Sequence, residues 1–255
     1  MAYANADGAR RDDFHGAEVL TAHTPMAKVT LLGDSAVIPD YLRDTYYWAY
    51  LDPSHVKSLD HEWVVRTILW QQHRKLANAA MSEIEPGQHV LQTACVYGDF
   101  SPMLAEHIGP EGKFEVMDVA GVQVRKCRSK LAKYENAIVR NQDVLYLRDE
   151  VFDVICCYFL MHEMPDTYKR GVAHALLKCV PPGGKVVFVD YHKPHWAHPL
   201  KPITSFIFDW LEPYAKGLWH TEIAELAGND ARFEWRKETY FGGLYQKVVA
   251  TRKGR

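Results

Sequence analysis

The chain has 255 residues, of which 47% are hydrophobic, and a formal net charge of −2 at pH 7. This length and apolar content suffice for one domain with a full core. The balanced charge, without a long basic run, argues against a nucleic-acid-binding protein. The five cysteines lack C-x-x-C spacing, which favours small buried side chains in a reducing compartment over a zinc or redox site. With no signal-peptide pattern and no apolar run of about 20 residues, we expect a cytoplasmic protein, with peripheral contact to the inner face of a membrane as an option.

The N-terminal third divides into two parts. Residues 1–38 show no sustained hydrophobic period, which predicts a flexible tail. Over 39–85, apolar side chains recur at helical spacing and predict a cap of three helices. The aromatic cluster at 46–50 lies within this cap. Core packing between helices is the favoured role for most of these rings, and forming a wall for a planar ligand is the alternative.

Residues 86–255 alternate short apolar runs with helical segments. This pattern predicts a parallel sheet whose right-handed crossover helices cover both faces. The last two runs flank Gly242-Gly243 and predict a closing antiparallel hairpin. The predicted fold is therefore α/β and Rossmann-like, a seven-stranded, mostly parallel sheet with an antiparallel last strand and an N-terminal helical cap. The predicted strands are 90–93, 114–118, 137–140, 152–159, 185–190, 235–240 and 246–251, and the predicted helices are 102–108, 122–134, 169–179 and 203–219.

The stretch at 89–101 indicates a buried strand, a tight turn at Gly98 and a helix. In such a unit, backbone N–H groups at the start of the helix face a ligand beyond the carboxyl end of the strand. Asp118 ends the second predicted strand, where a carboxylate in these folds accepts hydrogen bonds from a ribose diol. Asp143 follows the third strand, within reach of an adenine amino group. Together these positions predict a nucleoside site, and the alternative is that both acids only cap the helices after them.

These motifs resemble those of the class I S-adenosylmethionine-dependent methyltransferases, and most closely the branch that methylates the ubiquinone and menaquinone ring. That branch has V-L-D-x-A-G-G-T-G-D where this chain has V-L-Q-T-A-C-V-Y-G-D at 90–99. The motifs at 116–118, 152–155 and 182–185 also match. The resemblance assigns 86–255 to an S-adenosylmethionine-binding domain.

Three further features resemble the RquA family of rhodoquinone-biosynthesis enzymes, which have this fold but transfer an amino group. They are the Y-Y-W-A-Y segment at 46–50, the altered turn after the first strand, and the apolar helix at 206–219. The resemblance implies S-adenosylmethionine as amino donor, ubiquinone as lipid-soluble substrate, and Mn²⁺ as metal. The predicted helix at 203–219 offers an apolar surface that suits a lid or a lipid contact.

One departure from the methyltransferase pattern bears on the chemistry. Ordinary members have an acid at the position of Gln92, near the ammonium of the methionyl moiety, where it favours the charged amine. Without that acid the pKa of the amine falls, and a neutral amine can add to an electrophilic quinone ring with loss of methoxide. A divalent metal held by the methionyl amine and carboxylate would lower that pKa further and polarise a quinone carbonyl. We therefore predict amination of ubiquinone to rhodoquinone.

The candidate residues follow from these motifs and from the polar residues that come after the fourth and fifth strands. Carboxylate and imidazole together suit Mn²⁺, whereas His195 and His198 lie in a Pro-rich loop, where exposure without a ligand is the favoured state. The catalytic candidates are Gln92, Tyr97, His162 and Glu163; the cofactor-binding candidates are Thr93, Ala94, Cys95, Gly98, Asp99, Asp118, Val119, Asp143, Val144 and Tyr158; the metal candidates are Glu163, Asp190 and His192.

Two other functions stay open. A conventional quinone or small-molecule C- or O-methyltransferase would use the same nucleoside site. A catalytically silent quinone-binding protein would explain why side chains replace glycines in the turn, although the two acids Asp118 and Asp143 argue against it. The sequence leaves the oligomeric state undetermined.

Overall fold

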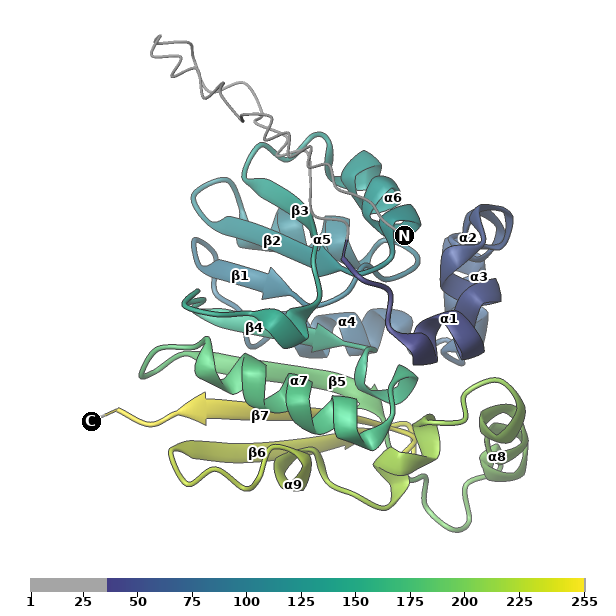
Figure 1. Cartoon of the computed structure of the whole chain (residues 1–255). Coiled ribbons are helices and arrows are strands. Elements are labelled where there is room, and N and C mark those ends of the chain that lie inside the picture. Colours follow the sequence, from purple (N-terminus) through teal and green to yellow (C-terminus); the bar gives the residue numbers. More distant parts are fainter. Residues whose placement is uncertain (1–35, 255) are drawn as a thin grey trace, which may run out of the picture. The chain divides into compact units, whose positions relative to one another are not determined.

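The computed structural model describes residues 36–254, so the predicted tail lies outside the described residues as far as residue 35. The described part contains a seven-stranded sheet in the order β3-β2-β1-β4-β5-β7-β6 (Figure 1). β7 is antiparallel to both of its neighbours, and the other adjacent strands pair in parallel. The predicted Rossmann-like α/β fold is therefore confirmed. The strands are β1 (His89–Gln92), β2 (Lys113–Asp118), β3 (Ala137–Asn141), β4 (Val154–Tyr158), β5 (Lys185–Tyr191), β6 (Phe233–Tyr240) and β7 (Tyr245–Arg252).

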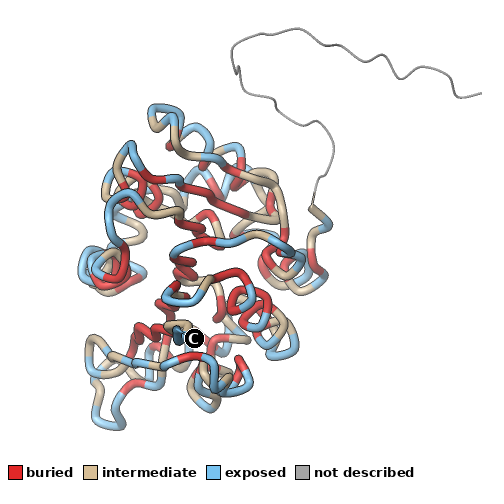
Figure 2. Tube along the Cα trace, turned by 90° about the vertical axis from the view of Figure 1, so that its left-hand side faces the viewer, coloured by how far each residue is buried: buried red, intermediate tan, exposed pale blue. Residues whose placement is uncertain are grey.

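Each face of the sheet carries its own hydrophobic core. Successive side chains of a strand point to opposite faces, so on β4 Cys156 joins the core under α4, α5 and α6, and Ile155 joins the core under α7 and α9. Because both faces are covered, all five residues of β4 are buried. Figure 2 shows such buried residues concentrated through the middle of the fold. The covering helices are α4 (His73–Met81), α5 (Phe100–Ile108), α6 (Gly121–Leu131), α7 (Asp166–Lys178) and α9 (Ile223–Leu226).

The cap differs from the predicted set of three helices. Residues 39–85 form α1 (Asp40–Tyr46), a π-helical segment η1 (Tyr47–Leu51), α2 (Pro53–Leu59), α3 (Glu62–Ile68) and α4. Two local signals divide the helical pattern. Asp52 caps α2 by accepting a hydrogen bond from the Ser54 N–H, 2.8 Å away, and positive φ angles at Trp70 and Gln71 end the run after α3.

The predicted helix at 203–219 is also divided. It consists of α8 (Lys201–Trp210) and a separate 3₁₀ segment η4 (Ala215–Trp219). Pro213 lies between them, and a proline has no N–H to continue the helical hydrogen bonds. Within residues 36–254, no helix combines the length and the apolar character needed to span a bilayer.

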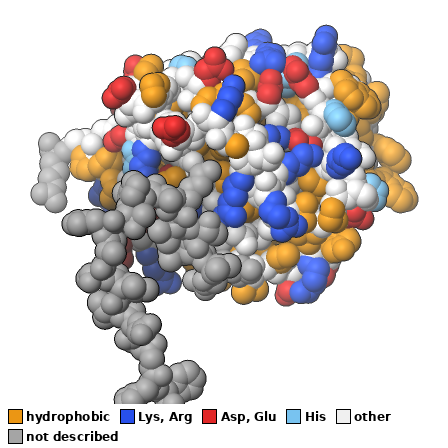
Figure 3. Space-filling view, turned by 90° about the horizontal axis from the view of Figure 1, so that it is seen from above, with side chains coloured by type: hydrophobic (Ala, Val, Ile, Leu, Met, Phe, Trp, Pro, Cys, Tyr) orange, Lys and Arg blue, Asp and Glu red, His pale blue; other side chains and the backbone are white. Residues whose placement is uncertain are grey.

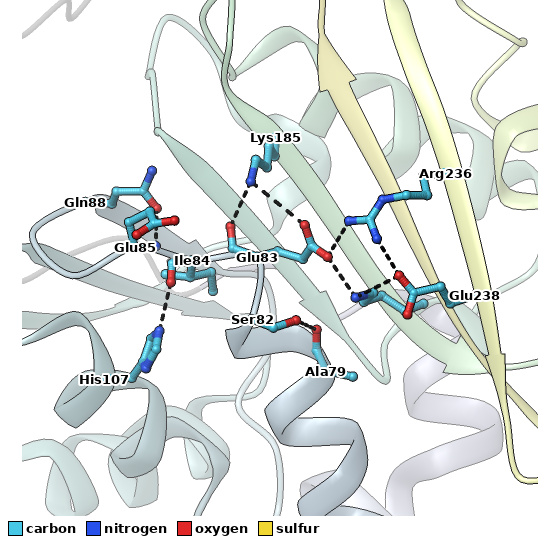
Figure 4. A network of polar contacts seen from close by, with 11 residues as sticks. Ala79, Ser82, Glu83, Ile84, Glu85, Gln88, His107, Lys185, Arg236 and Glu238 are labelled. Carbon is cyan, nitrogen blue, oxygen red and sulfur yellow. Dashed lines mark hydrogen bonds and ion pairs between the residues drawn. The ribbon is translucent and has the colours of Figure 1, made fainter.

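A buried ion network joins the end of α4 to the C-terminal hairpin (Figure 4). The Glu83 carboxylate lies 2.7 Å from the Lys247 ammonium on β7 and also pairs with Arg236 on β6. Glu83 and Lys247 are 7% and 4% exposed. Although burial opposes ionisation, the hydrogen bonds from Lys247 and Arg236 hold the pKa of Glu83 below its usual value. The network therefore fixes the hairpin against the face that carries α4.

Replacing Glu83 by Ala should lower the free energy of unfolding by about 1–3 kcal/mol, because the buried Lys247 ammonium would lose one of its two carboxylate partners and keep only Glu238, 3.2 Å away. Urea denaturation followed by circular dichroism measures this loss. The matched control is Glu234→Ala on the exposed side of β6, which should change stability by less than about 0.5 kcal/mol. Equal effects of the two variants would mean that the network contributes nothing specific.

Candidate functional site

A cavity of about 200 Å³ lies beyond the carboxyl ends of the central strands, between the cap and the sheet. Most of the predicted cofactor-binding residues line it. The predicted residues on its wall are Thr93, Ala94, Cys95, Tyr97, Asp118, Val119, Asp143, Val144, Tyr158, His162 and Glu163. Gly98 and Asp99 line a separate, smaller cavity instead.

Asp118 is fixed at the point where β2 ends. Its Oδ2 accepts a hydrogen bond from the Cys95 N–H at 2.8 Å, and its Oδ1 accepts one from the Ala120 N–H at 2.7 Å. Burial raises the pKa of Asp118 to about 6. Each carboxylate oxygen can accept a further hydrogen bond, so the group can still bind a diol from the cavity.

Asp143, which follows β3, caps a short helical segment and also lines the cavity. Its Oδ1 accepts a hydrogen bond from the Leu145 N–H at 2.8 Å, which caps the short 3₁₀ segment η2 (Val144–Tyr146). The same residue lines the cavity, and burial raises the pKa of its carboxyl group. Capping a turn and facing a ligand are therefore compatible at this position.

The turn after β1 is bound by the cap rather than open to a ligand at Gly98. Gly98 has φ +78°, and its N–H donates to Asp60 Oδ1, 2.8 Å away in the loop between α2 and α3. Asp60 also pairs with Lys126 at 3.1 Å and with Lys130. Asp99 faces outward and pairs with Arg74 at 2.7 Å. The structure thus does not bring Gly98 or Asp99 to the cavity wall, because the cap occupies that side of the turn.

Gln92 lies behind the cavity wall. It is fully buried, and its Nε2 donates to the Ala94 carbonyl at 2.6 Å. Its Oε1 has no hydrogen-bond partner among the described residues. Thr93, the next residue, does line the cavity, and its buried hydroxyl likewise lacks a partner among the residues at 36–254. A buried polar group without a partner at a cavity wall is a natural contact for a polar ligand.

The aromatic residues of the cap have different roles. Tyr46 is fully buried, in agreement with core packing, whereas Tyr50 lines the cavity. Tyr50 stacks on Tyr97, with 5.8 Å between ring centroids and 10° between planes. The Tyr97 hydroxyl donates to the Ala49 carbonyl and accepts a hydrogen bond from Gln123. This stacked pair links the cap to the turn and forms one side of the cavity.

An acid–base cluster occupies the end of the cavity after β4. His162, in the 3₁₀ segment η3 (Met161–Glu163), pairs through Nδ1 with Asp190 Oδ1 at 2.9 Å. Its Nε2 lies 3.9 Å from Glu212 Oε2 and 4.0 Å from Glu163 Oε1. We refer to His162, Glu163, Asp190 and Glu212 as the acid–base cluster. Sequence reasoning missed Glu212, which is one of two acids, with Asp209, in an apolar stretch predicted to be one helix.

Burial and proximity shift the acid–base properties of this cluster. Burial lowers the pKa of His162, but the carboxylates of Asp190, Glu212 and Glu163 outweigh it and raise that pKa to about 9. Burial raises the pKa of Glu163 to about 8, against the opposing effect of His162. The pKa of Glu212 is raised for the same reason. Groups with pKa values near the working pH are suited to general acid–base catalysis.

Of the three predicted metal ligands, Glu163 and Asp190 lie in the acid–base cluster, whereas His192 lies apart from it. The Asp190 oxygens accept hydrogen bonds from the backbone N–H groups of Met161 and Tyr191, besides the bond to His162. His192 lies off the cavity, because its Nδ1 contacts the Gly243 carbonyl and its Nε2 contacts the Lys237 ammonium, each at 2.8 Å. Across residues 36–254, no group of three or more His, Cys, Asp or Glu side chains is placed to hold a metal ion. The predicted Mn²⁺ ligand set of Glu163, Asp190 and His192 therefore does not fit the ion, and we derive no step through it.

The family described as "Methyltransferase domain" matches residues 90–184. This match runs from β1 to the turn before β5 and includes the acids that follow β2 and β3, so this segment is similar to the class I S-adenosylmethionine-dependent methyltransferases. About half of the chain is also similar in sequence to quinone-biosynthesis methyltransferases. The chain is 28% identical over 133 residues to the demethylmenaquinone methyltransferase of Alkalihalophilus pseudofirmus, covering 50% of this chain and 56% of that protein. It is 25% identical over 134 residues to the ubiquinone/menaquinone biosynthesis C-methyltransferase UbiE of Ectopseudomonas mendocina, covering 51% and 50%.

The chain thus spans about half the length of the curated relatives it matches. Solved structures show the same fold. The N-methyltransferase NodS of Bradyrhizobium japonicum, in complex with S-adenosyl-l-homocysteine, aligns with a TM-score of 0.58 at 14% identity, covering 85% of this chain and 100% of that one. A SAM-dependent methyltransferase from Aquifex aeolicus aligns with a TM-score of 0.55 at 19% identity, covering 79% and 98%.

Proposed function

We propose that this protein uses S-adenosylmethionine to aminate ubiquinone, replacing a methoxy group of the ring to give rhodoquinone. The acids Asp118 and Asp143 on the cavity wall support binding of the adenosine. The names of the related proteins, which are quinone-biosynthesis methyltransferases, support a quinone ring as the acceptor. The resemblance to the RquA family supports amino transfer in place of methyl transfer.

The observation that carries the proposal is the distribution of acids around the cavity. At the end of β1 the chain has the neutral amide of Gln92, tied to the Ala94 carbonyl, where a carboxylate would favour an ammonium ion. At the other end the acid–base cluster offers carboxyl groups of raised pKa. An ammonium group has no free electron pair, so amine attack requires a base that takes its proton. The neutral amide at Gln92 supplies no further carboxylate to favour the charged form.

Three residues of the acid–base cluster have different roles in the addition of the amine to the quinone ring. Glu163 takes a proton from the donor amine, which then forms a bond to the ring carbon that bears the methoxy group. His162 donates a hydrogen bond from Nε2 to a quinone carbonyl, where negative charge develops. The methoxide leaves as methanol after it takes up a proton. To leave a free amino group on the ring, the bond between the nitrogen and the methionyl Cα must then break; elimination of methylthioadenosine and hydrolysis of the resulting imine by water release the carbon chain as 2-oxobutyrate, with no net oxidation or reduction. Asp190 touches neither reactant; it is a positioning residue that holds the imidazole through Nδ1.

Isotope labelling tests the proposal directly. The purified protein is incubated with ubiquinone and S-adenosylmethionine labelled with ¹⁵N in its amine, with and without added Mn²⁺. We expect the label on the quinone ring by mass spectrometry. Stoichiometric S-adenosylhomocysteine with no ring label would support a conventional quinone methyltransferase instead, the function favoured by the related proteins. The absence of both products and of any thermal shift with S-adenosylmethionine would support a silent quinone-binding protein.

A further inference from the structure

Helix α8 exposes an apolar face. Ile203, Phe206 and Trp210 are 49%, 63% and 75% exposed, and their spacing places them on one side of the helix. The opposite side is anchored to the fold by the buried residues Thr204 and Phe208. Trp196 in the preceding loop is 79% exposed, and Leu211 after the helix is 48% exposed. We refer to these five exposed side chains as the α8 apolar face.

The α8 apolar face lies next to the mouth of the cavity. Trp48 and Ile68 of the cap line the cavity and are themselves 41% and 51% exposed. Glu212, two residues after the end of α8, also lines it. In Figure 1, α1, α2, α3 and α8 lie at the same end of the sheet, beyond the parallel strands. Figure 3 shows apolar side chains gathered along that edge of the molecule, at the right of the view.

We propose that the α8 apolar face docks on the surface of a lipid bilayer, so that the cavity mouth meets the layer that holds the substrate; this inference rests on the proposed function. Protruding aromatic and aliphatic side chains on an amphipathic helix are the usual means by which a protein lies in a membrane interface. The face contributes five side chains, whereas a stable protein partner takes roughly 20–30 residues a side. A lipid surface, unlike a protein partner, also leaves the mouth open to an isoprenoid quinone.

Vesicle binding tests this docking. The probe is vesicles of phosphatidylcholine and phosphatidylglycerol in equal parts, and the variant is Phe206→Glu with Trp210→Glu, two exposed positions that leave the core intact. We expect the wild-type protein to co-sediment with the vesicles. The affinity of the double variant for the vesicles should be at least about tenfold lower. The matched control is Ile138→Glu, an exposed position on β3 at the other edge of the sheet, which should bind as the wild type does.

Activity separates this inference from the proposed function. With a water-soluble quinone that lacks the isoprenoid chain, the double variant should turn over as fast as the wild type. With ubiquinone embedded in the vesicles its rate should fall about as much as its binding. If the wild-type protein does not bind the vesicles, or if the double variant binds them as well as the wild type does, the proposed membrane docking is wrong. Loss of concentration-dependent self-association in the variant would overturn it in favour of a second copy of the chain. A wild type inactive on both quinones would instead overturn the proposed function.

Discussion

Replacing Glu163 by Gln lowers the turnover number by at least about 100-fold, the usual effect of removing a general base, while S-adenosylmethionine binds with nearly unchanged affinity. The reason is that Glu163 belongs to the acid–base cluster after β4, whereas the acids proposed to bind the adenosine follow β2 and β3. Steady-state kinetics with the quinone and calorimetric titration with S-adenosylmethionine measure the two quantities separately. The matched control is Glu106→Gln on the exposed face of α5, which should change neither.

The pH dependence of the rate gives this prediction a second readout. A base whose pKa lies at about 8 is mostly protonated at neutral pH, so the wild-type rate should rise as the pH increases through about 8. In Glu163→Gln the residual rate should lose that rise. A variant that keeps both the wild-type turnover number and the wild-type pH profile would show that Glu163 is not the base.

Stability should respond to the same groups in the opposite direction. The pKa of Glu163 is raised from 4.5 to about 8 in the folded protein, so the folded state holds this proton more tightly and loses stability as the pH rises from about 4.5 through 8. The pKa of His162 is raised from 6.5 to about 9, so its contribution is present below 6.5 and is lost through 9. Glu163→Gln should therefore be more stable than the wild type above about pH 8, as measured by urea unfolding.

Local sequence patterns predicted which helices and strands form more accurately than they predicted the residues at which these elements begin and end. The apolar run on β4 and the acid at the end of β2 lie within segments whose periodicity or position is visible in the sequence, and both are where they were expected. The division of the helix at 203–219 could have been predicted from Pro213 alone. The number of cap helices depended on the positive φ angles at Trp70 and Gln71. Neither tryptophan nor glutamine is a residue type that indicates a positive φ angle, so this break could not be predicted from the sequence.

The contents of the candidate site were harder to predict, because they depend on residues distant in the sequence. The Gly98 N–H faces Asp60 of the cap, which lies 38 residues earlier. Glu212 reaches His162 only because the chain turns back after α8. His192, although two residues from Asp190, is held by the hairpin turn at Gly243. A motif gives the side chains that follow a strand, but the partners that orient them come from tertiary packing.

Asp118 should contribute most to binding of the cofactor. Replacing it by Asn should weaken S-adenosylmethionine binding about 10–100-fold, because a charged acceptor is lost at the position proposed to bind the ribose diol, and hydrogen bonds to charged groups contribute about 1.5–3 kcal/mol. The new amide must also place its NH₂ group against the N–H of Cys95 or Ala120, both of which now donate to the carboxylate. Calorimetric titration at about pH 7.5 measures the affinity, since the pKa of about 6 leaves the wild-type group ionised there.

A matched variant separates a lost contact from a damaged fold. Asp149→Asn changes an exposed acid at a positive φ angle, which Asn tolerates well, and should bind S-adenosylmethionine as the wild type does. Thermal unfolding without ligand shows whether Asp118→Asn is folded under the conditions of the titration. If it is folded and binds as tightly as the wild type, the adenosine does not lie against β2. In that case the nucleoside site, and with it the assignment of the opposite end of the cavity to the quinone, would have to be abandoned.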